Sequence, residues 1–93
     1  MKEISVRSAS RFEMIDITEA IRQATREEKI ESGIVLVYTP HTTAAVTINE
    51  NADPDVPRDL LAALDRAVPL SANYRHSEGN SAAHVKSDRK SVV

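Results

Sequence analysis

Residues 34–38, from Ile34 to Tyr38, form the longest apolar run of the chain and constrain its fold more than any other segment. The run is rich in β-branched side chains and is apolar on both faces, which is typical of a strand in the middle of a sheet. Residues 2–7 alternate between apolar and polar side chains, as a half-buried strand does, and residues 44–48 also have strand composition. A further short strand is expected around residues 12–15.

A surface helix is predicted over residues 17–29, because its apolar residues recur at helical spacing and its charged residues occupy the opposite face. Asp16 is the expected N-cap, and Glu19, three residues later, is its expected capping-box partner. Ser32 and Gly33 are expected to end the helix region.

Two more helices are predicted in the second half of the chain. Residues 56–67 carry leucines and valines at helical spacing, and acidic residues with prolines precede them, as at the entry of a helix. Residues 70–79 are expected to form a polar loop. Asn80 is the expected N-cap of a short helix that runs to Lys86.

Length and composition exclude several classes of function. The 93 residues suffice for one small domain, and a formal net charge of −2 without a long basic run gives no support for nucleic-acid binding. The chain has no cysteine, which excludes disulfides and thiolate metal sites. Its longest apolar run is too short to cross a membrane, and the N-terminus lacks the apolar core of a signal peptide. We therefore expect a cytoplasmic protein with neither a membrane nor a nucleic-acid partner.

The three histidines, His41, His76 and His84, lie at predicted breaks or helix starts. Imidazole is a common metal ligand and a general acid or base near neutral pH, although a single histidine can equally cap a turn or face solvent. Asn80 and His84 are four residues apart and share a helix face. The N-terminus of that helix favours a phosphate or another anion, so we expect a polar site there.

A second polar cluster, from Asn49 to Asp55, follows the predicted strand at residues 44–48. Its oxygens could hold Mg²⁺ or Ca²⁺, although the glycine and the late glutamate of a calcium loop are absent. Capping of the next helix explains the aspartates at 53 and 55 but leaves Asn49 and Glu50 without a role. Arg58 and Arg75 could each pair with phosphate or be ordinary surface arginines.

Two motifs resemble the YjbQ-like family. The first runs through His41-Thr42-Thr43-Ala44-Ala45, Ile48-Asn49-Glu50-Asn51-Ala52-Asp53-Pro54 and Arg58-Asp59-Leu60. The second is Tyr74-Arg75-His76-Ser77-Glu78-Gly79-Asn80-Ser81, followed by Ala83-His84. The motifs occur in the family's order with a predicted helix between them, and the resemblance covers residues 1–87.

The resemblance implies an α+β fold with a mixed β-sheet or sandwich, two main helices, a short third helix and a homotrimeric assembly. It also implies a shared polar pocket. The expected catalytic residues are His41, Glu50, His76 and His84, and the expected substrate-binding residues are Asn49, Arg75, Glu78 and Asn80. The family's final strands, beyond the Ala-His-Val-Lys region, are absent, so we expect a C-terminally truncated domain with poor folding cooperativity and a tendency to aggregate. Residues 88–93 are interpreted as a non-native tail read from a sequencing adapter.

Three functions are weighed for this site. The family is often described as a secondary thiamine-phosphate synthase, which joins a pyrimidine-methyl diphosphate to a thiazole phosphate and needs a divalent cation such as Mg²⁺. The second function is a hydrolase in which His41, His76 and His84 hold Zn²⁺ and leave a position for water. The third is a non-catalytic module that binds a small phosphorylated metabolite or a similar anion.

Overall fold

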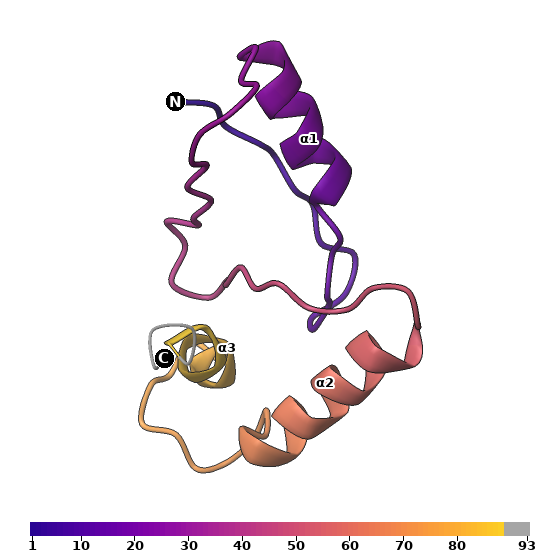
Figure 1. Cartoon of the computed structure of the whole chain (residues 1–93). Coiled ribbons are helices and arrows are strands. Elements are labelled where there is room, and N and C mark those ends of the chain that lie inside the picture. The colour runs from indigo at the N-terminus through magenta and orange to yellow at the C-terminus, as the bar shows by residue number, and fades with distance from the viewer. Residues whose placement is uncertain (89–93) are drawn as a thin grey trace. The chain divides into compact units, whose positions relative to one another are not determined.

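The computed structural model describes residues 1–88 and divides them into two units, one comprising Met1–Val35 and the other beginning at Leu36. The first unit contains α1 (Thr18–Glu27), and the second contains α2 (Asp55–Ala67) and α3 (Ser81–Asp88) (Figure 1). Each helix lies where the sequence predicts one, with small shifts at its ends. The three predicted helices are therefore confirmed.

Helix α1 begins one residue later than the sequence predicts: its N-cap is Ile17, without a side-chain cap, and the predicted capping box of Asp16 and Glu19 is not formed. Asp16 Oδ1 accepts hydrogen bonds from the Thr18 backbone N–H at 2.9 Å and from the Thr18 hydroxyl at 2.6 Å. The carboxylate of Glu19 pairs with the Arg22 guanidinium at 2.7 Å. The apolar stripe of the helix is half-buried and consists of Ile17, Ala20, Ile21 and Ala24. The charged residues of the helix are exposed.

Helix α2 is anchored at its start by Asp53. Asp53 Oδ1 accepts a hydrogen bond from the Asp55 backbone N–H at 2.9 Å, and the Asp53 carbonyl accepts one from Val56 N–H at 3.1 Å. Asp55 itself pairs with Arg58 at 3.2 Å. The N-cap of α2 is Pro54, without a side-chain cap, so the predicted capping by Asp53 and Asp55 is not confirmed, although Asp53 holds the turn that leads into the helix. The half-buried face of α2 is the apolar face that the sequence predicts. It consists of Val56, Leu60, Leu61 and Leu64, together with Val68, which follows the helix directly.

A hydrogen bond and an ion-pair contact help to hold α3 within the second unit. The Ser87 hydroxyl donates a 2.6 Å hydrogen bond to the Ala44 carbonyl, 43 residues earlier in the chain. The Lys86 ammonium lies 3.9 Å from the Asp65 carboxylate of α2. Ala82 and Ser87, at 1% and 4% exposed, are the buried residues of α3. The helix is therefore fixed through its inner face and its C-terminal turn.

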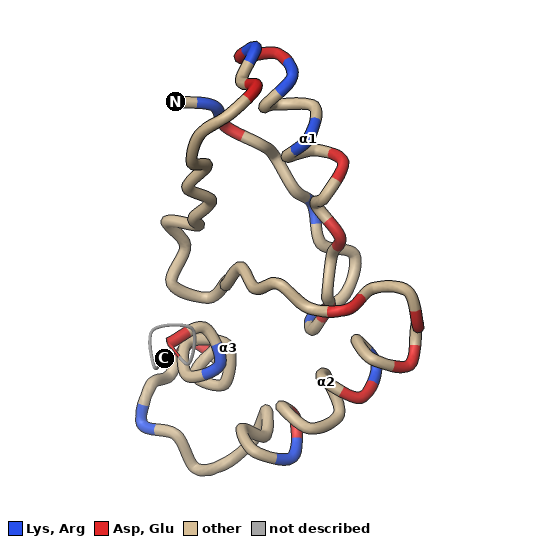
Figure 2. Tube along the Cα trace, viewed as in Figure 1, with Lys and Arg blue, Asp and Glu red and all other residues tan. Residues whose placement is uncertain are grey.

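The predicted strands have no counterpart in residues 1–88, where the structure contains helices, turns and irregular segments. Residues 32–49 carry no charged side chain, as Figure 2 shows, yet Ile34, Leu36 and Ile48 are 97%, 83% and 97% exposed. A strand exists through hydrogen bonds to a neighbouring strand, and one or two strands without an apolar partner layer are marginally stable in water. The α+β class therefore stays a prediction.

None of the helices in residues 1–88 combines the length and the apolar character needed to traverse a bilayer. Helix α3 includes Asp88, the first residue of the segment interpreted as a non-native tail. The remainder of that segment, residues 89–93, lies outside the described residues.

We predict that substitution of Lys2 changes the titration of Glu27. Lys2 donates a hydrogen bond to the Glu27 carboxylate, which lowers the pKa of Glu27, with a smaller contribution from Gln23. The ion pair therefore stabilises the first unit above the ordinary carboxyl pKa and is lost as the pH falls through the lowered value. In carbon-detected NMR titrations, Lys2→Met should raise the Glu27 pKa, whereas the control Lys29→Met should leave it nearly unchanged. An unchanged midpoint in Lys2→Met would contradict the pairing.

Candidate functional site

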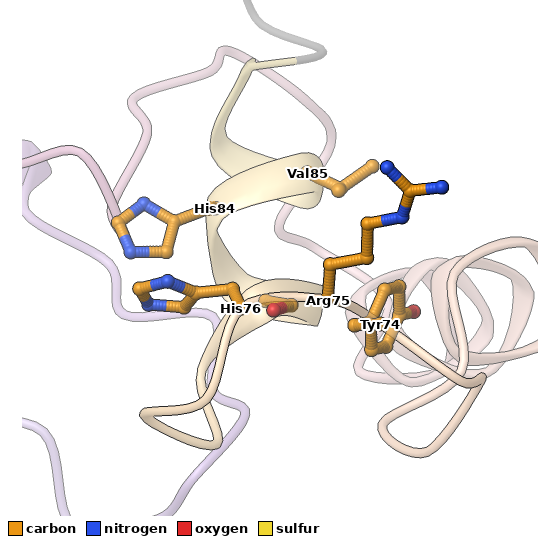
Figure 3. Close-up of a pocket in the computed structure, with 6 residues that line it drawn as sticks. Tyr74, Arg75, His76, His84 and Val85 are labelled. Atoms are coloured by element: carbon orange, nitrogen blue, oxygen red, sulfur yellow. The ribbon is translucent and has the colours of Figure 1, made fainter.

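A shallow hollow of about 420 Å³ lies at the start of α3, in the second unit. The loop before α3 supplies Tyr74, Arg75 and His76, and the helix supplies Ser81, His84 and Val85 (Figure 3). Ser81 lies three and four positions before His84 and Val85, whose side chains extend to different sides of α3 (Figure 3). The hollow therefore joins the second sequence motif to the first turns of the helix that follows it.

His76 and His84 form a pair at this hollow. Their ring centroids are 5.4 Å apart and their planes are perpendicular, so the rings meet edge to face. Figure 3 shows both imidazoles extending to the same side of α3. His84 is half-buried, whereas His76 is exposed. Two imidazoles in this arrangement present several ring nitrogens to one region, and each nitrogen can donate or accept a hydrogen bond according to its protonation.

The charged groups around the histidine pair lie on different sides. The Glu78 carboxylate is 3.7 Å from His76 Nε2, a contact that becomes an ion pair when the imidazole is protonated. Arg75 lines the hollow, but its guanidinium extends toward Val85 and away from the two imidazoles (Figure 3). The second motif thus places an acid beside the histidine pair and a permanent cation on the other side of α3.

Two polar atoms at the start of α3 are buried without a hydrogen-bond partner among the described residues, namely Asn80 Oδ1 and Ser81 Oγ. The Asn80 carbonyl accepts the first helical hydrogen bond, from His84 N–H at 3.1 Å. Asn80 therefore occupies the predicted position before the helix, but its side-chain oxygen does not cap it. Buried polar atoms are normally satisfied by protein, water or ligand, because an unpaired one costs about 1–3 kcal/mol.

Tyr74 forms the opposite wall of the hollow. Its hydroxyl donates a hydrogen bond to the Pro69 carbonyl, just beyond the end of α2, and its ring is half-buried. This hydrogen bond ties the 70–79 loop back to α2. Tyr74 belongs to the second sequence motif, but no role for it was predicted from the sequence.

A second hollow, of about 380 Å³, lies on the C-terminal side of the first. The residues that line it are Thr39, Pro40, His41, Thr42, His84, Ser87 and Asp88. The backbone N–H of His41 donates a 3.3 Å hydrogen bond to the Thr39 hydroxyl, which holds the turn that carries this histidine. His84 lines both hollows.

The structure brings some of the predicted site residues together and leaves others apart. Arg75, His76 and His84 line the first hollow, and His41 and His84 line the second. Asn49 and Glu50 line neither; both are exposed, and the Glu50 N–H donates a 2.7 Å hydrogen bond to Asn49 Oδ1. Their role in a common site stays a prediction.

The predicted three-histidine metal site has no counterpart in the described part of the chain. Among residues 1–88, no group of three or more histidines, aspartates and glutamates is arranged to hold a metal ion. The three histidines are divided between two hollows, and only His84 is shared. The assignment of Mg²⁺ or Zn²⁺ to these residues stays a prediction.

Thr39 and Ser87 contribute to the second hollow, although neither was predicted from the sequence as a site residue. One signal could have indicated Ser87: it follows His84 by three positions, so the two residues share a helix face. No local pattern could have indicated that this face meets Ala44, because the contact spans 43 residues. Thr39 could have been recognised as a turn residue two positions before His41.

We predict that Ser87→Ala loosens α3. The substitution removes the hydrogen bond to the Ala44 carbonyl, which stabilises the docked helix by about 1 kcal/mol. Hydrogen exchange followed by NMR should show faster exchange of the α3 amides, by about fivefold. The control Ser71→Ala, in an exposed loop, should leave these rates unchanged. Equal protection of α3 in both variants would show that the bond does not hold the helix.

Comparisons with known proteins identify the relatives of the chain. Residues 2–89 match the family described as UPF0047 protein YjbQ-like. UPF0047 protein YugU of Bacillus subtilis is 49% identical over 88 residues, which cover 94% of this chain and 67% of the relative. UPF0047 protein MJ1081 of Methanocaldococcus jannaschii is 48% identical, over 88% of this chain and 59% of the relative.

A solved structure is also similar. It is the crystal structure of an uncharacterized conserved YjbQ/UPF0047 protein from Clostridium acetobutylicum, with a TM-score of 0.78 and 50% identity over 82% of this chain and 59% of that one. The chain therefore spans about three fifths to two thirds of the length of these relatives. The family match extends over nearly all of its residues and includes both motifs, so the chain belongs to the YjbQ-like UPF0047 family.

Proposed function

We propose that the first hollow binds the phosphate or diphosphate group of a small metabolite. The observation that carries this proposal is the pair of imidazoles, His76 and His84, whose rings lie 5.4 Å apart and extend to the same side of α3 (Figure 3). A phosphate group has several acceptor oxygens, and two imidazoles that donate N–H groups can bind two of them. Protonated imidazoles would add charge to these hydrogen bonds and strengthen them.

The start of α3 supports the same ligand class. The first backbone N–H groups of a helix have no intrahelical partners, and the helix dipole is positive at this end, so anions are favoured there. Ser81 lies in the first turn, and its hydroxyl oxygen is buried without a partner among residues 1–88. A hydroxyl can rotate to donate to a phosphate oxygen. The motif thus combines imidazole, hydroxyl and backbone donors within one short segment.

Arg75 supplies a further cation to this hollow. Its guanidinium is permanently charged, but it extends away from the imidazole pair (Figure 3). We therefore assign Arg75 to attraction and orientation of the anion, and we assign the direct hydrogen bonds to the two histidines. Glu78, 3.7 Å from His76, orients this imidazole.

We propose a thiamine-phosphate-synthase-type transfer as the reaction of this site. In it a ring nitrogen of the thiazole phosphate forms a bond to the methylene carbon of the pyrimidine-methyl diphosphate, and the carbon–oxygen bond to diphosphate breaks. Diphosphate leaves with the electron pair, so stabilisation of its negative charge lowers the barrier. His76 and His84 would bind the leaving diphosphate. The resemblance of both motifs to the family supports this reaction class, and no step is assigned to a metal ion.

The family resemblance and the composition support a proposal for the assembly and the surroundings of this function. We propose that it operates in the cytoplasm on a small phosphorylated metabolite, without nucleic-acid or membrane partners. We also propose homotrimers for longer members of the family. A non-catalytic module that binds the same anion would use the same hollow, and turnover distinguishes the two.

We predict that the 93-residue chain binds diphosphate and that both histidines contribute. In NMR titrations, diphosphate should shift the imidazole signals of His76 and His84 before those of His41. His76→Ala and His84→Ala should each weaken binding by about tenfold, because each removes a hydrogen bond to a charged ligand. Arg75→Ala should have a smaller effect, and the control Arg66→Ala, an exposed cation of α2, should have none. Unchanged affinity in His76→Ala and His84→Ala would exclude the proposed site.

We predict that catalytic turnover requires the same histidines. With pyrimidine-methyl diphosphate and thiazole phosphate as substrates, release of diphosphate should depend on both substrates and fall by at least about a hundredfold in His84→Ala. The assay should be run on the 93-residue chain and, as a positive reference, on YugU with the equivalent substitution. Diphosphate binding without turnover in both proteins would favour the binding module over the transferase.

A further inference from the structure

Helix α3 is a shared wall of both hollows. It supplies Ser81 and His84 to the first hollow, and His84 and Ser87 to the second. The loop at residues 74–76 forms the rest of the first hollow, and the turn at residues 39–42 forms the rest of the second. Both hollows therefore require that α3 lies docked in the second unit.

The helix is too short to keep its conformation in water by itself. It has 8 residues, whereas isolated helices shorter than about 12–15 residues are marginal even with favourable sequences. Its buried residues are Ala82 and Ser87, which are both small, and Ser87 is polar. Helix α2, in contrast, has 13 residues and a half-buried stripe of leucines and valines. The helicity of α3 therefore depends on its docking.

The contacts that dock α3 include polar ones of modest strength. The Ser87 hydroxyl donates to the Ala44 carbonyl, and a hydrogen bond of this kind changes an equilibrium constant by about fivefold. The Lys86 ammonium lies 3.9 Å from the carboxylate of Asp65, whose side chain is 61% exposed. An exposed pair of this kind changes an equilibrium constant by about twofold. Elements attached in this way belong to the part of a protein that opens most readily.

We propose that a phosphate group bound in the first hollow docks α3 and thereby completes the second hollow. This conformational step rests on the proposed function of the first hollow. Phosphate would contact His76 on the loop and His84 on the helix at once, so it bridges the loop and the docked helix. An undocked helix does not present the two imidazoles together. The anion therefore binds the docked state more tightly and shifts the population toward it.

The two hollows are then coupled through one helix. Docking of α3 brings Ser87 to the Ala44 carbonyl and places His84 in the hollow that also contains His41. A ligand of the second hollow thus finds its site formed once phosphate is bound. Because such coupling is reciprocal, contacts that dock α3 from outside the first hollow contribute to the affinity for phosphate.

Hydrogen exchange of the 93-residue chain, with and without inorganic phosphate, tests the coupling. At a phosphate concentration about ten times its Kd, the amides of Val85, Lys86 and Ser87 should exchange about tenfold more slowly, because a ligand of the docked state stabilises that state by about this factor. The amides of α1, in the first unit, should be unchanged. Exchange of the α3 amides that does not slow at saturating phosphate would overturn the proposal.

Two substitutions outside the first hollow separate this coupling from electrostatic attraction. Ser87→Ala should weaken phosphate binding by about threefold, because the docked fraction of α3 falls. Asp65→Asn removes a negative charge, which by Coulomb attraction alone would strengthen phosphate binding, but loss of the contact with Lys86 should weaken it by up to about twofold. The matched control Asp59→Asn removes the same charge from an exposed position of α2 and should not weaken binding.

The outcomes separate the coupling from the function on which it rests. If phosphate shifts the imidazole signals of His76 and His84, but neither Ser87→Ala nor Asp65→Asn weakens its binding, α3 docks independently of the anion and the proposed function survives. If phosphate does not bind the wild type, the proposed function of the first hollow is wrong, and the coupling with it. Amide spectra of α2 in each variant report whether the second unit is folded, and the wild-type exchange experiment needs no variant.

Discussion

The hydrogen bond from the Ser87 hydroxyl to the Ala44 carbonyl is the contact on which the arrangement of the candidate site depends. It joins the last turn of α3 to a segment 43 residues earlier, and Ser87 is almost completely buried. The hydrogen bond brings the turn that carries His41 to the helix face that carries His84. The Lys86–Asp65 contact adds a second attachment, to α2. Because a long-range hydrogen bond has to offset the entropy of closing a large loop, α3 also needs its buried Ala82 to remain docked.

The site combines two chemistries around one imidazole. The first hollow has cationic and imidazole donors beside the start of a helix, and the second has hydroxyls and a histidine held by a turn. Neither hollow contains three metal-binding side chains in a suitable arrangement, within residues 1–88. Selectivity in such a site comes from the match of hydrogen-bond donors and acceptors between ligand and protein. A polar group that binding leaves without a partner destabilises the complex by more than one matched hydrogen bond stabilises it.

The uncharged segment from residue 32 to residue 49 differs most from its sequence-based prediction. Its large apolar side chains, Ile34, Leu36 and Ile48, are exposed, although residues of this type are usually buried. Exposed apolar surface is a site of association or aggregation. We propose that residues 34–38 and 44–48 become strands of an α+β fold where neighbouring strands are available. The relatives are longer than this chain, and a strand needs partners for its backbone groups.

The sequence by itself determined the three helices and the family, because helix periodicity depends on neighbouring residues and the family match depends on two specific motifs. It also predicted histidines as the centre of the site. Only the tertiary structure decided which histidines lie together. His76 pairs with His84, whereas His41 lines a separate hollow that also includes His84. Glu50 lines neither of the two hollows. The reason is physical. Helix periodicity and caps are local, whereas the position of α3 depends on a hydrogen bond between distant residues, and strands depend on partners that no local pattern supplies.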